Sequence, residues 1–164
     1  MFGGQDALRT PPPARHRRHS ATGRDALKRP IGEKCMPLVR ANPEGGAWPG
    51  VSMGLAVTGS GLFLTTGHTG TYAQGEPVTT SVEDQVVALF ENLRATLASA
   101  GLGFEHVAQI KAYLKSFDPD FMSTYRAVRA GYLNQSCPPT SVAVQAGLYD
   151  ERLLIEAEVV AVIP

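Results

Sequence analysis

The pentapeptide from Gly50 to Gly54 has the spacing of a serine nucleophile. In hydrolases, a glycine–x–serine–x–glycine pattern marks a sharp turn between a strand and a helix, and an Asp and a His follow later in the chain. Here a strand pattern follows Ser52, not a helix, and the regular part of the chain after residue 35 is too short for a complete hydrolase sheet. The sequence therefore argues against a serine hydrolase.

Metal and phosphate chemistry is not indicated either. Residues 36–164 contain two histidines, His68 and His106, and neither has a second His, Cys or carboxylate at ligand spacing. The sequence contains no G-x-x-x-x-G-K-[ST] phosphate loop and no basic face interleaved with aromatic residues. We therefore expect no metal and no other cofactor, and nucleic acid is not favoured as a partner.

Two carboxylates stand two residues apart in the last apolar segment of the chain. Glu156 and Glu158 lie within Leu153 to Val162, whose composition predicts a strand. Residues at i and i+2 of a strand share one face, so both carboxylates project from the same side of the sheet. That side is either the solvated face of an ordinary strand or, because apolar residues crowd this segment, part of a site.

Extended patterns and one helical pattern come before these carboxylates. Val51 to Val57 and Leu62 to Thr66 are extended runs separated by a glycine-rich turn, which suits a hairpin. Ser81 opens a capping-box sequence, and apolar residues then recur at helical spacing until Gly101. This segment is therefore predicted to be the first helix.

The second half of the domain repeats the alternation of strand and helix. Residues 107–114 alternate as a strand, and a second helix begins at Asp118 with Pro119 in its first turn. Thr140 to Ala146 and Leu153 to Val162 follow as strands. The predicted order is ββαβαββ, an α+β fold in which two helices cover one face of a mixed sheet.

Residues 1–35 differ from the rest in charge and composition. They carry eight basic residues, three acidic residues and four prolines, with almost no periodic apolar residues. Such a segment cannot offset the entropy lost on ordering, so we expect a disordered, basic, proline-rich extension before one domain over residues 36–164. An organelle transit peptide, a basic arm for nucleic acid and sequence upstream of a start at Met36 remain alternatives.

Composition limits the class of protein. A chain of 164 residues, 43% of them apolar, can bury roughly two-thirds of its unfolded surface in one core. No apolar run approaches the roughly 20 residues that cross a bilayer, so no membrane partner is expected. The only cysteines, Cys35 and Cys137, are too few for a disulfide framework and favour a cytoplasmic location.

From about Pro49 to Ile163 the chain resembles the RidA (YjgF) family of small trimeric reactive-intermediate deaminases. The likeness rests on Leu62-Phe63-Leu64-Thr65-Thr66-Gly67-His68, similar to a family strand ending in Ser-Gly-Gln, on Gln85 and Asn92 in the first helix, and on Ala100-Gly101, Tyr113-Leu114, Asp120-Phe121, Pro138 and Ile155 to Ala161. Met36 also falls where members of this family commonly begin.

The resemblance implies a chorismate-mutase-like fold assembled as a homotrimer, with clefts between neighbouring subunits. The sequence agrees with this, because two helices cover only one face of a sheet. Val142, Val144, Ile155 and Val159 give the strands more apolar surface than one helical layer needs. An ordinary monomer with a few exposed valines is the alternative.

Members of the family hydrolyse enamines and imines to ketones and release ammonia, using a carboxyl group and an arginine that grips the substrate carboxylate. By resemblance, Glu156 matches that carboxyl group and is the expected catalytic residue. The family's arginine follows a Pro-x pair, and Thr140 stands at this position. The two-pronged contact is therefore missing, and 2-imino acids are not the expected substrates.

Five further residues are expected to bind substrate through the same resemblance. Thr66 replaces a serine of the family site, and His68 lies on the loop that the family places near the cleft mouth. Tyr125 aligns with an asparagine of the second helix, and Thr140 and Ser141 occupy the arginine position and the one after it. Each also has a simpler role, as a core residue (Tyr125), a surface residue or an ordinary strand residue.

Two functions follow from these observations. The first is a divergent enzyme that hydrolyses a small enamine, imine or related metabolite in a cleft between subunits, assisted by Glu156. The second is a noncatalytic trimer that binds a small molecule or a partner in that cleft. RNA cleavage, with which some members of the family are associated, is a weaker third.

Overall fold

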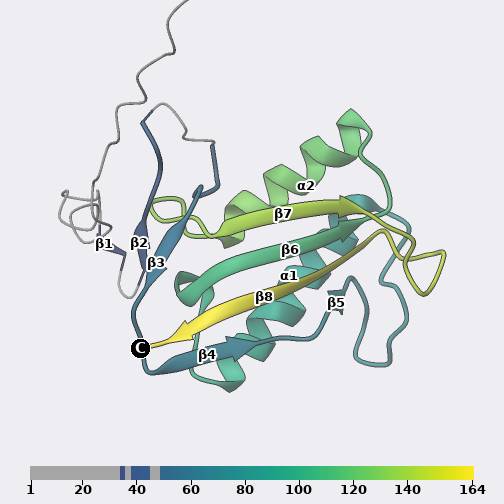
Figure 1. The fold of residues 1–164 in the computed structure, drawn as a ribbon. Coiled ribbons are helices and arrows are strands. Elements are labelled where there is room, and N and C mark those ends of the chain that lie inside the picture. The colour runs from purple at the N-terminus through teal and green to yellow at the C-terminus, as the bar shows by residue number, and fades with distance from the viewer. Residues whose placement is uncertain (1–33, 36–37, 45–48) are drawn as a thin grey trace, which may run out of the picture. The chain divides into compact units, whose positions relative to one another are not determined.

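The computed structural model describes residues 34–35, 38–44 and 49–164. The larger of its two sheets has the strand order β4-β8-β6-β7, and the short strand β5 also pairs with β8 (Figure 1). These strands are β4 (Gly61–Leu64), β5 (His68–Thr69), β6 (Val107–Leu114), β7 (Thr140–Gln145) and β8 (Ile155–Ile163). Strands β6 and β7 are parallel and the other pairs of this sheet are antiparallel, which confirms the predicted mixed sheet.

Both predicted helices form, and local sequence explains their ends. Helix α1 spans Val82–Ser99, and the Ser81 hydroxyl accepts a hydrogen bond from the Asp84 backbone N–H at 3.3 Å. Gly101, with a φ of 71°, takes the left-handed conformation that follows the end of the helix. A 3-10 turn, η2 (Phe104–His106), leads into β6. Helix α2 spans Pro119–Tyr132 and is capped by Asp118.

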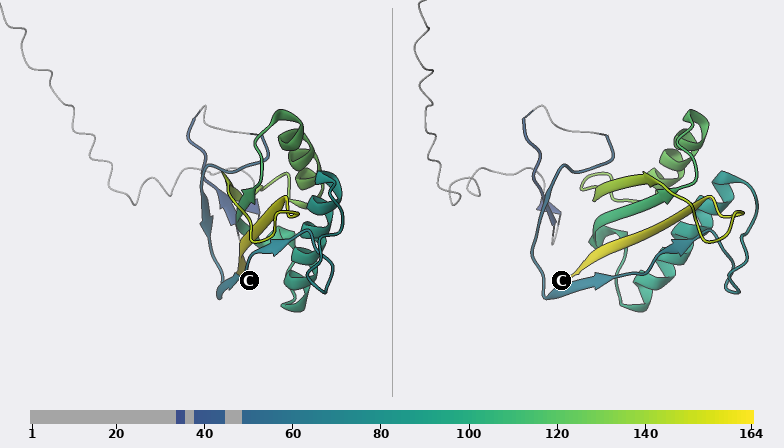
Figure 2. Two further views of the ribbon diagram at one scale, coloured as in Figure 1. Left: turned by 90° about the vertical axis from the view of Figure 1, so that its right-hand side faces the viewer. Right: turned by 45° about the vertical axis from the view of Figure 1, so that its right-hand side comes forward.

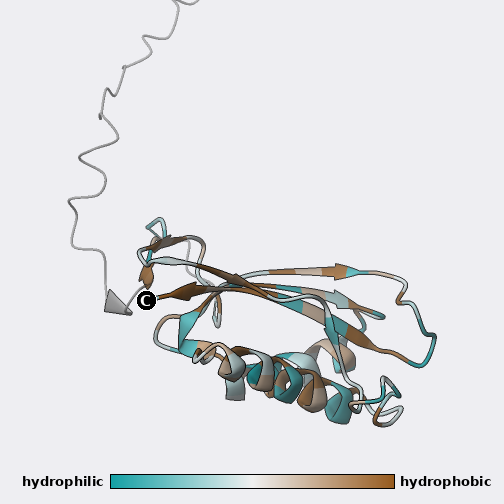
Figure 3. Cartoon of the chain, turned by 90° about the horizontal axis from the view of Figure 1, so that it is seen from below, coloured by the Kyte–Doolittle hydropathy of each residue, from teal (hydrophilic) through white to brown (hydrophobic). Residues whose placement is uncertain are grey.

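The helices lie on the same face of the large sheet (Figures 2 and 3). Strand β8 shows the resulting alternation, because every second side chain of the strand is buried beneath the helices. The buried positions are Ile155, Ala157, Val159 and Ala161, which pack with the apolar faces of α1 and α2. Glu156 and Glu158 therefore project from the opposite face, as their spacing predicts.

The predicted hairpin between Val51–Val57 and Leu62–Thr66 is wrong. Strand β3 (Leu55–Val57) pairs with β2 (Leu38–Arg40), whereas β4 pairs with β8. The intervening turn is held by the end of β8, since the Ser60 N–H donates to the Ile163 carbonyl at 2.8 Å. Two strands joined by a turn thus belong to two different sheets.

Strands β1 (Lys34–Cys35), β2 and β3 form the small second sheet. The fully buried Leu38 of β2 packs with Ala108, Cys137 and Val162, so this sheet covers one end of the large sheet on the face opposite the helices (Figure 2). The predicted extension over residues 1–35 lies outside the described residues except for Lys34–Cys35. In the described part of the chain, no helix is long and apolar enough to cross a membrane.

Candidate functional site

The large sheet leaves most of one face without a covering helix, and we call this surface the open sheet face. The strand register and the alternation of side chains assign to it Leu62 and Leu64 on β4, Gln109, Lys111 and Tyr113 on β6, Thr140, Val142 and Val144 on β7, and Glu156, Glu158 and Val160 on β8. Four of its apolar residues are strongly exposed: Leu62, Leu64, Val142 and Val144. The open sheet face thus combines apolar and acidic side chains.

Glu156 lies in this face where three strands meet. Its backbone pairs with Tyr113 of β6 on one side and with Thr69 of β5 on the other. Directly paired residues project from the same face, so Tyr113 and Glu156 are neighbours on the open sheet face. The carboxyl group covers Gly67, where an added Cβ would clash with a carboxyl oxygen. The absence of a side chain at Gly67 therefore leaves room for the carboxyl group in this position.

The two carboxylates of β8 differ in their partners. Glu158 forms an ion pair with Lys111 at 3.1 Å. Glu156 takes part in no ion pair with the residues that the structure describes. Of the two, Glu156 is thus the carboxylate available to a substrate or a water molecule on this face.

Thr66 and His68 lie next to Gly67, but the His68 side chain turns away from Glu156. Its Nδ1 bonds the Thr66 carbonyl at 3.0 Å and its Nε2 bonds the Thr96 hydroxyl of α1 at 2.8 Å. A neutral ring that donates from Nδ1 accepts from Thr96 at Nε2. Thr66, the residue before Gly67, is exposed. Thr66 therefore adjoins the glycine that the Glu156 carboxyl group covers, whereas the His68 side chain points to the helix side of the sheet.

Thr140 is on the open sheet face at a distance from Glu156. It pairs with Gln109, which pairs with Val160, four residues along β8 from Glu156. At about 3.3 Å per residue, that is roughly 13 Å along the strand direction. The Thr140 hydroxyl donates to the Ala108 carbonyl at 3.1 Å. One chain alone does not bring Thr140 and Glu156 together.

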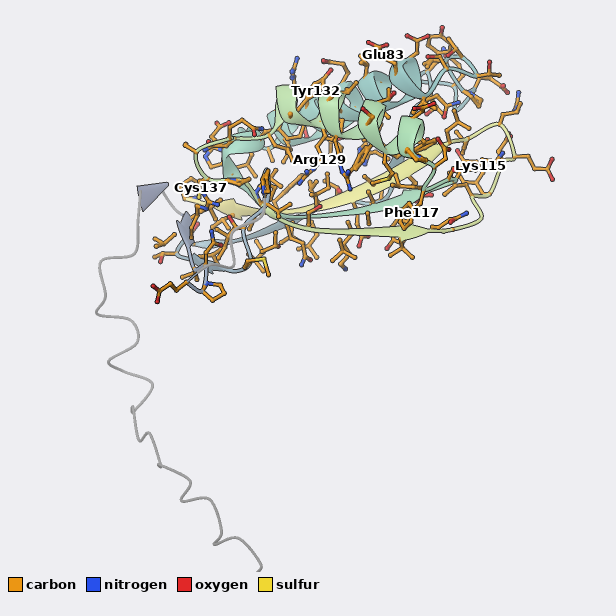
Figure 4. All side chains as sticks on the ribbon, turned by 90° about the horizontal axis from the view of Figure 1, so that it is seen from above. Glu83, Lys115, Phe117, Arg129, Tyr132 and Cys137 are labelled. Atoms are coloured by element: carbon orange, nitrogen blue, oxygen red, sulfur yellow. The ribbon has the colours of Figure 1, made fainter. Side chains whose placement is uncertain are left out.

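Tyr125 and Ser141 lie together on the helix-covered side of the sheet. Both line a pocket of about 590 Å³ bounded by α2, β7 and the segment 49–51, which we call the α2 pocket. Its wall is largely apolar, and two arginines of α2, Arg126 and Arg129, also line it. In Figure 4, Arg129 lies between α2 and the sheet. The two adjacent β7 residues that were predicted to bind substrate, Thr140 and Ser141, therefore lie on opposite faces of the sheet, and Tyr125 lies on the side of Ser141.

Arg129 is the residue of the α2 pocket that the sequence interpretation missed. It is only 8% exposed, its Nη2 donates to the Gly50 carbonyl at 3.1 Å, and its Nε has no partner among the described residues. Desolvation lowers the pKa of this guanidinium. Arg129 follows Tyr125 by four residues, the helical spacing that puts two side chains on one face, and this signal was available in the sequence.

The Tyr125 hydroxyl is equally without a partner. The residue is 3% exposed, and its hydroxyl bonds no atom of the described residues. Burial raises the pKa of this phenol, and the nearby charges of Arg129 and Arg126 oppose that rise. Within the same part of the chain, no group of three or more His, Cys, Asp or Glu side chains could hold a metal ion. The charged groups that line the α2 pocket are the guanidiniums of Arg126 and Arg129.

Comparisons with known proteins identify the fold and the family. A RutC family protein of Pyrococcus horikoshii is 34% identical over 87 residues, covering 53% of this chain and 67% of that protein. A RutC family protein of the cyanobacterium Synechocystis is 28% identical over 111 residues, covering 66% of this chain and 84% of that protein.

Solved structures agree in fold. A protein of the conserved Rid family from Yersinia pestis has a TM-score of 0.66 at 24% identity, covering 78% of this chain and all of that one. A YjgF family member from Neisseria meningitidis has a TM-score of 0.55 at 19% identity, covering 80% of this chain and 98% of that one. The family model described as endoribonuclease L-PSP matches residues 52–163. The chain therefore belongs to the RidA (YjgF) family, which this model represents.

Proposed function

We propose that the protein hydrolyses small enamines or imines that lack a carboxylate, with Glu156 as the acid–base group. The observation that carries the proposal is the position of Glu156, which by resemblance matches the family's carboxyl group. It lies over Gly67 on the open sheet face and forms no ion pair with the described residues. A carboxyl group so placed is available to exchange protons with a substrate nitrogen and a water molecule.

The proposed reaction consumes one water and releases one ammonia. Glu156 protonates the substrate, at carbon for an enamine or at nitrogen for an imine, and its carboxylate then accepts a proton from the attacking water. The oxygen–carbon bond forms as the carbon–nitrogen π bond breaks. The amino group of the resulting carbinolamine is protonated and leaves as ammonia, and the hydroxyl proton is lost as the carbonyl forms. We include Tyr113, whose backbone pairs with that of Glu156, in the proposal as a further hydrogen-bond donor.

The restriction to substrates without a carboxylate rests on Thr140. By resemblance this residue matches the position of the family's arginine, it is uncharged, and its hydroxyl donates to the Ala108 carbonyl. A bidentate, charge-assisted contact to a carboxylate is therefore not possible from this position. An imine or enamine with an uncharged carbon skeleton does not need such a contact to bind.

The proposal includes a homotrimer whose subunits complete the site. Thr140 and Glu156 are far apart on one open sheet face, and that face exposes Leu62, Leu64 and Val144. An apolar surface of this kind is favourably buried against another copy, which brings the Thr140 end of one sheet to the Glu156 end of the next. We place the reaction in the cytoplasm, where the imines of intermediary metabolism arise.

The test compares two imines that differ in a carboxylate. A flavin amine oxidase acting on benzylamine releases an imine without a carboxylate, and an amino-acid oxidase acting on leucine releases a 2-imino acid. With the purified protein present, we expect faster ammonia release from the first imine and little acceleration with the second. Glu156→Gln is expected to lower the rate by about 100-fold or more, because it preserves shape and removes proton transfer.

Glu158→Gln is the matched control, because it alters a neighbouring carboxylate of the same strand and face. Its activity is expected to stay within about twofold of the wild type, because the half-exposed ion pair that it breaks contributes little free energy. Equal rates for wild type and Glu156→Gln would contradict the catalytic role of Glu156. If the protein accelerates the hydrolysis of neither imine, the proposal that it is an enzyme is contradicted and the noncatalytic trimer is favoured. If it rapidly hydrolyses the 2-imino acid, the proposed substrate class is contradicted.

A further inference from the structure

The chain carries one extra residue beside Glu156. Between the last pair that β4 makes with β8 and the first pair that β5 makes with it, the chain advances four residues, from Leu64 to His68, whereas β8 advances only three. Residues 65–67 therefore form a bulge against β8, and bulges are common next to active sites, where they redirect side chains. Gly67, which the Glu156 carboxyl group covers, lies in this bulge. The position of the carboxyl group thus depends on what holds the bulge.

Backbone pairing holds the bulge only at its edges. At its start, the Thr65 N–H donates to the Val159 carbonyl at 3.1 Å, and the Thr65 hydroxyl accepts from the Val159 N–H at 3.0 Å. After the bulge, β5 pairs with β8 over two residues. Between these points, the Thr66 carbonyl accepts a hydrogen bond from the His68 ring. That carbonyl belongs to the peptide group that leads into Gly67, so a side chain holds this part of the bulge.

One face of α1 binds this region from the helix-covered side of the sheet. Asn92 donates to the Thr69 and Thr71 carbonyls, at 3.0 Å each. Thr96, four residues after Asn92 and so on the same face of the helix, bonds His68 Nε2 through its hydroxyl at 2.8 Å. Asn92 thus holds the chain after the bulge, and the His68 ring connects the bulge itself to the helix.

We propose that His68 is a positioning residue for Glu156. Its ring joins the Thr66 carbonyl to the Thr96 hydroxyl of α1. The link fixes Gly67, against which the Glu156 carboxyl group lies. Because the ring points to the helix side of the sheet, His68 acts on the carboxyl group without contacting a substrate on the open sheet face. The effect on rate rests on the proposed hydrolysis, whereas the effect on the position of the carboxyl group does not.

The position of the carboxyl group is tested by NMR on the full chain, labelled with ¹³C at the glutamate side-chain carboxyls. Glu156→Gln identifies the Glu156 resonance by its loss. His68→Asn keeps an N–H at the δ position for the Thr66 carbonyl and removes the nitrogen that reaches Thr96, and Thr96→Val removes the hydroxyl while keeping the shape of the side chain. We expect both variants to shift the Glu156 resonance by more than its linewidth. The resonance of Glu158, on the same strand, is expected to stay in place.

The kinetics of imine hydrolysis give a second readout. His68→Asn and Thr96→Val are expected to lower kcat about tenfold and to leave KM within about twofold, because a displaced acid–base group slows the chemical step without weakening substrate binding. Thr96→Ser keeps the hydroxyl and is expected to stay within about twofold of the wild type in both constants. Ser99→Ala is the matched control, since the Ser99 hydroxyl bonds the Thr96 carbonyl within α1 and does not reach the bulge. It is expected to behave as the wild type does.

A double-variant cycle separates positioning from general damage to the fold. In the Glu156→Gln background, Thr96→Val is expected to change the residual rate by less than about twofold, because the acid–base group that it would displace is already gone. A variant that damages the fold would lower the rate by a similar factor in both backgrounds.

Three results would overturn the inference. The first is a Glu156 resonance that is unchanged in both His68→Asn and Thr96→Val. The second is a kcat in both variants equal to that of the wild type, and the third is an equal loss of rate on Thr96→Val with and without the Glu156 carboxyl group. A wild-type protein that hydrolyses neither imine contradicts the proposed function alone, and the Glu156 resonance then decides whether His68 positions this carboxyl group.

Discussion

At the scale of single residues, Tyr125 carries a polar group that the folded chain does not use. Its ring packs in the core while its hydroxyl bonds no atom of the described residues. Tyr125→Phe is expected to raise the free energy of unfolding by about 1 kcal/mol, because it removes the cost of desolvating an unpaired hydroxyl and keeps the ring. Urea unfolding without added ligand measures the difference.

Tyr132→Phe is the control, with the opposite expectation. It removes the 2.7 Å bond between the Tyr132 hydroxyl and Glu91, so its stability is expected to fall slightly or stay unchanged. A destabilisation of Tyr125→Phe by more than about 0.5 kcal/mol would mean that its hydroxyl has a partner in solution, contrary to the contacts of the structure.

Sequence reasoning reached some of these residues and missed others for physical reasons. Helical spacing placed Tyr125 on the buried face, and strand alternation placed Glu156 opposite the core. Arg129 was missed because arginine is normally exposed, and only the packing of α2 against the segment 49–51 buries it. The direction of His68 depends on the Thr96 hydroxyl, 28 positions away, which no local pattern reveals.

At the scale of elements, the start of α2 depends on a charged cap. The Asp118 carboxylate accepts hydrogen bonds from the Ser116 hydroxyl at 2.6 Å and the Phe121 N–H at 2.9 Å. These bonds lower the pKa of Asp118 below its usual 3.8. A group with a lowered pKa contributes stability above its unfolded value of about 4, and that contribution is lost as pH falls through the folded value.

Asp118→Asn is therefore expected to lower the urea midpoint at pH 7, and the deficit is expected to shrink as pH falls below about 4. The asparagine oxygen still caps the helix, so the pH-dependent part isolates the charge. Asp120→Asn is the control. Asp120 also lies in the first turn of α2 and interacts with the helix dipole, but it does not make these two bonds, so its substitution is expected to change the urea midpoint less. If Asp118→Asn lowers the urea midpoint by the same amount at pH 7 and at pH 3, a role for the Asp118 charge is contradicted.

The sequence was sufficient to predict the helices and the longer strands of the large sheet, but it did not predict one of the strand pairings. The capping sequences at Ser81 and Asp118 and the left-handed Gly101 are local signals, and both helices form where these signals stand. The turn between β3 and β4 also looked local and suited a hairpin. Strand partners are chosen by tertiary contacts, and here Leu62 of β4 pairs with Val162, a hundred positions away.

At the scale of the whole molecule, the open sheet face gives a direct test of the proposed trimer. Leu64 is 68% exposed on this face, and Leu64→Glu is expected to dissociate the assembly because it buries a charge in an apolar contact. Val87→Glu makes the same kind of change on α1, where the side chain is 38% exposed, and is expected to leave the assembly intact. Sedimentation velocity distinguishes the two.

The proposed site between subunits adds an expectation about activity. If subunits complete the cleft, Leu64→Glu is also expected to lose any imine hydrolysis, whereas Val87→Glu keeps it. A wild-type protein that sediments as a monomer at micromolar concentration would contradict the trimer. A Leu64→Glu protein that stays trimeric would exclude this part of the open sheet face from the interface.

The place of β8 in the sheet also has a consequence during protein synthesis. Strand β8 lies between β4 and β6, yet it is made after every other strand of its sheet. At a synthesis rate of roughly 5–20 residues per second, about 5–20 s pass between the synthesis of β4 and that of β8. Until then the edges of β4 and β6 that pair with β8 present unpaired backbone N–H and C=O groups. The nascent chain is therefore expected to need protection by a chaperone, and its large sheet closes only when β8 has left the ribosome.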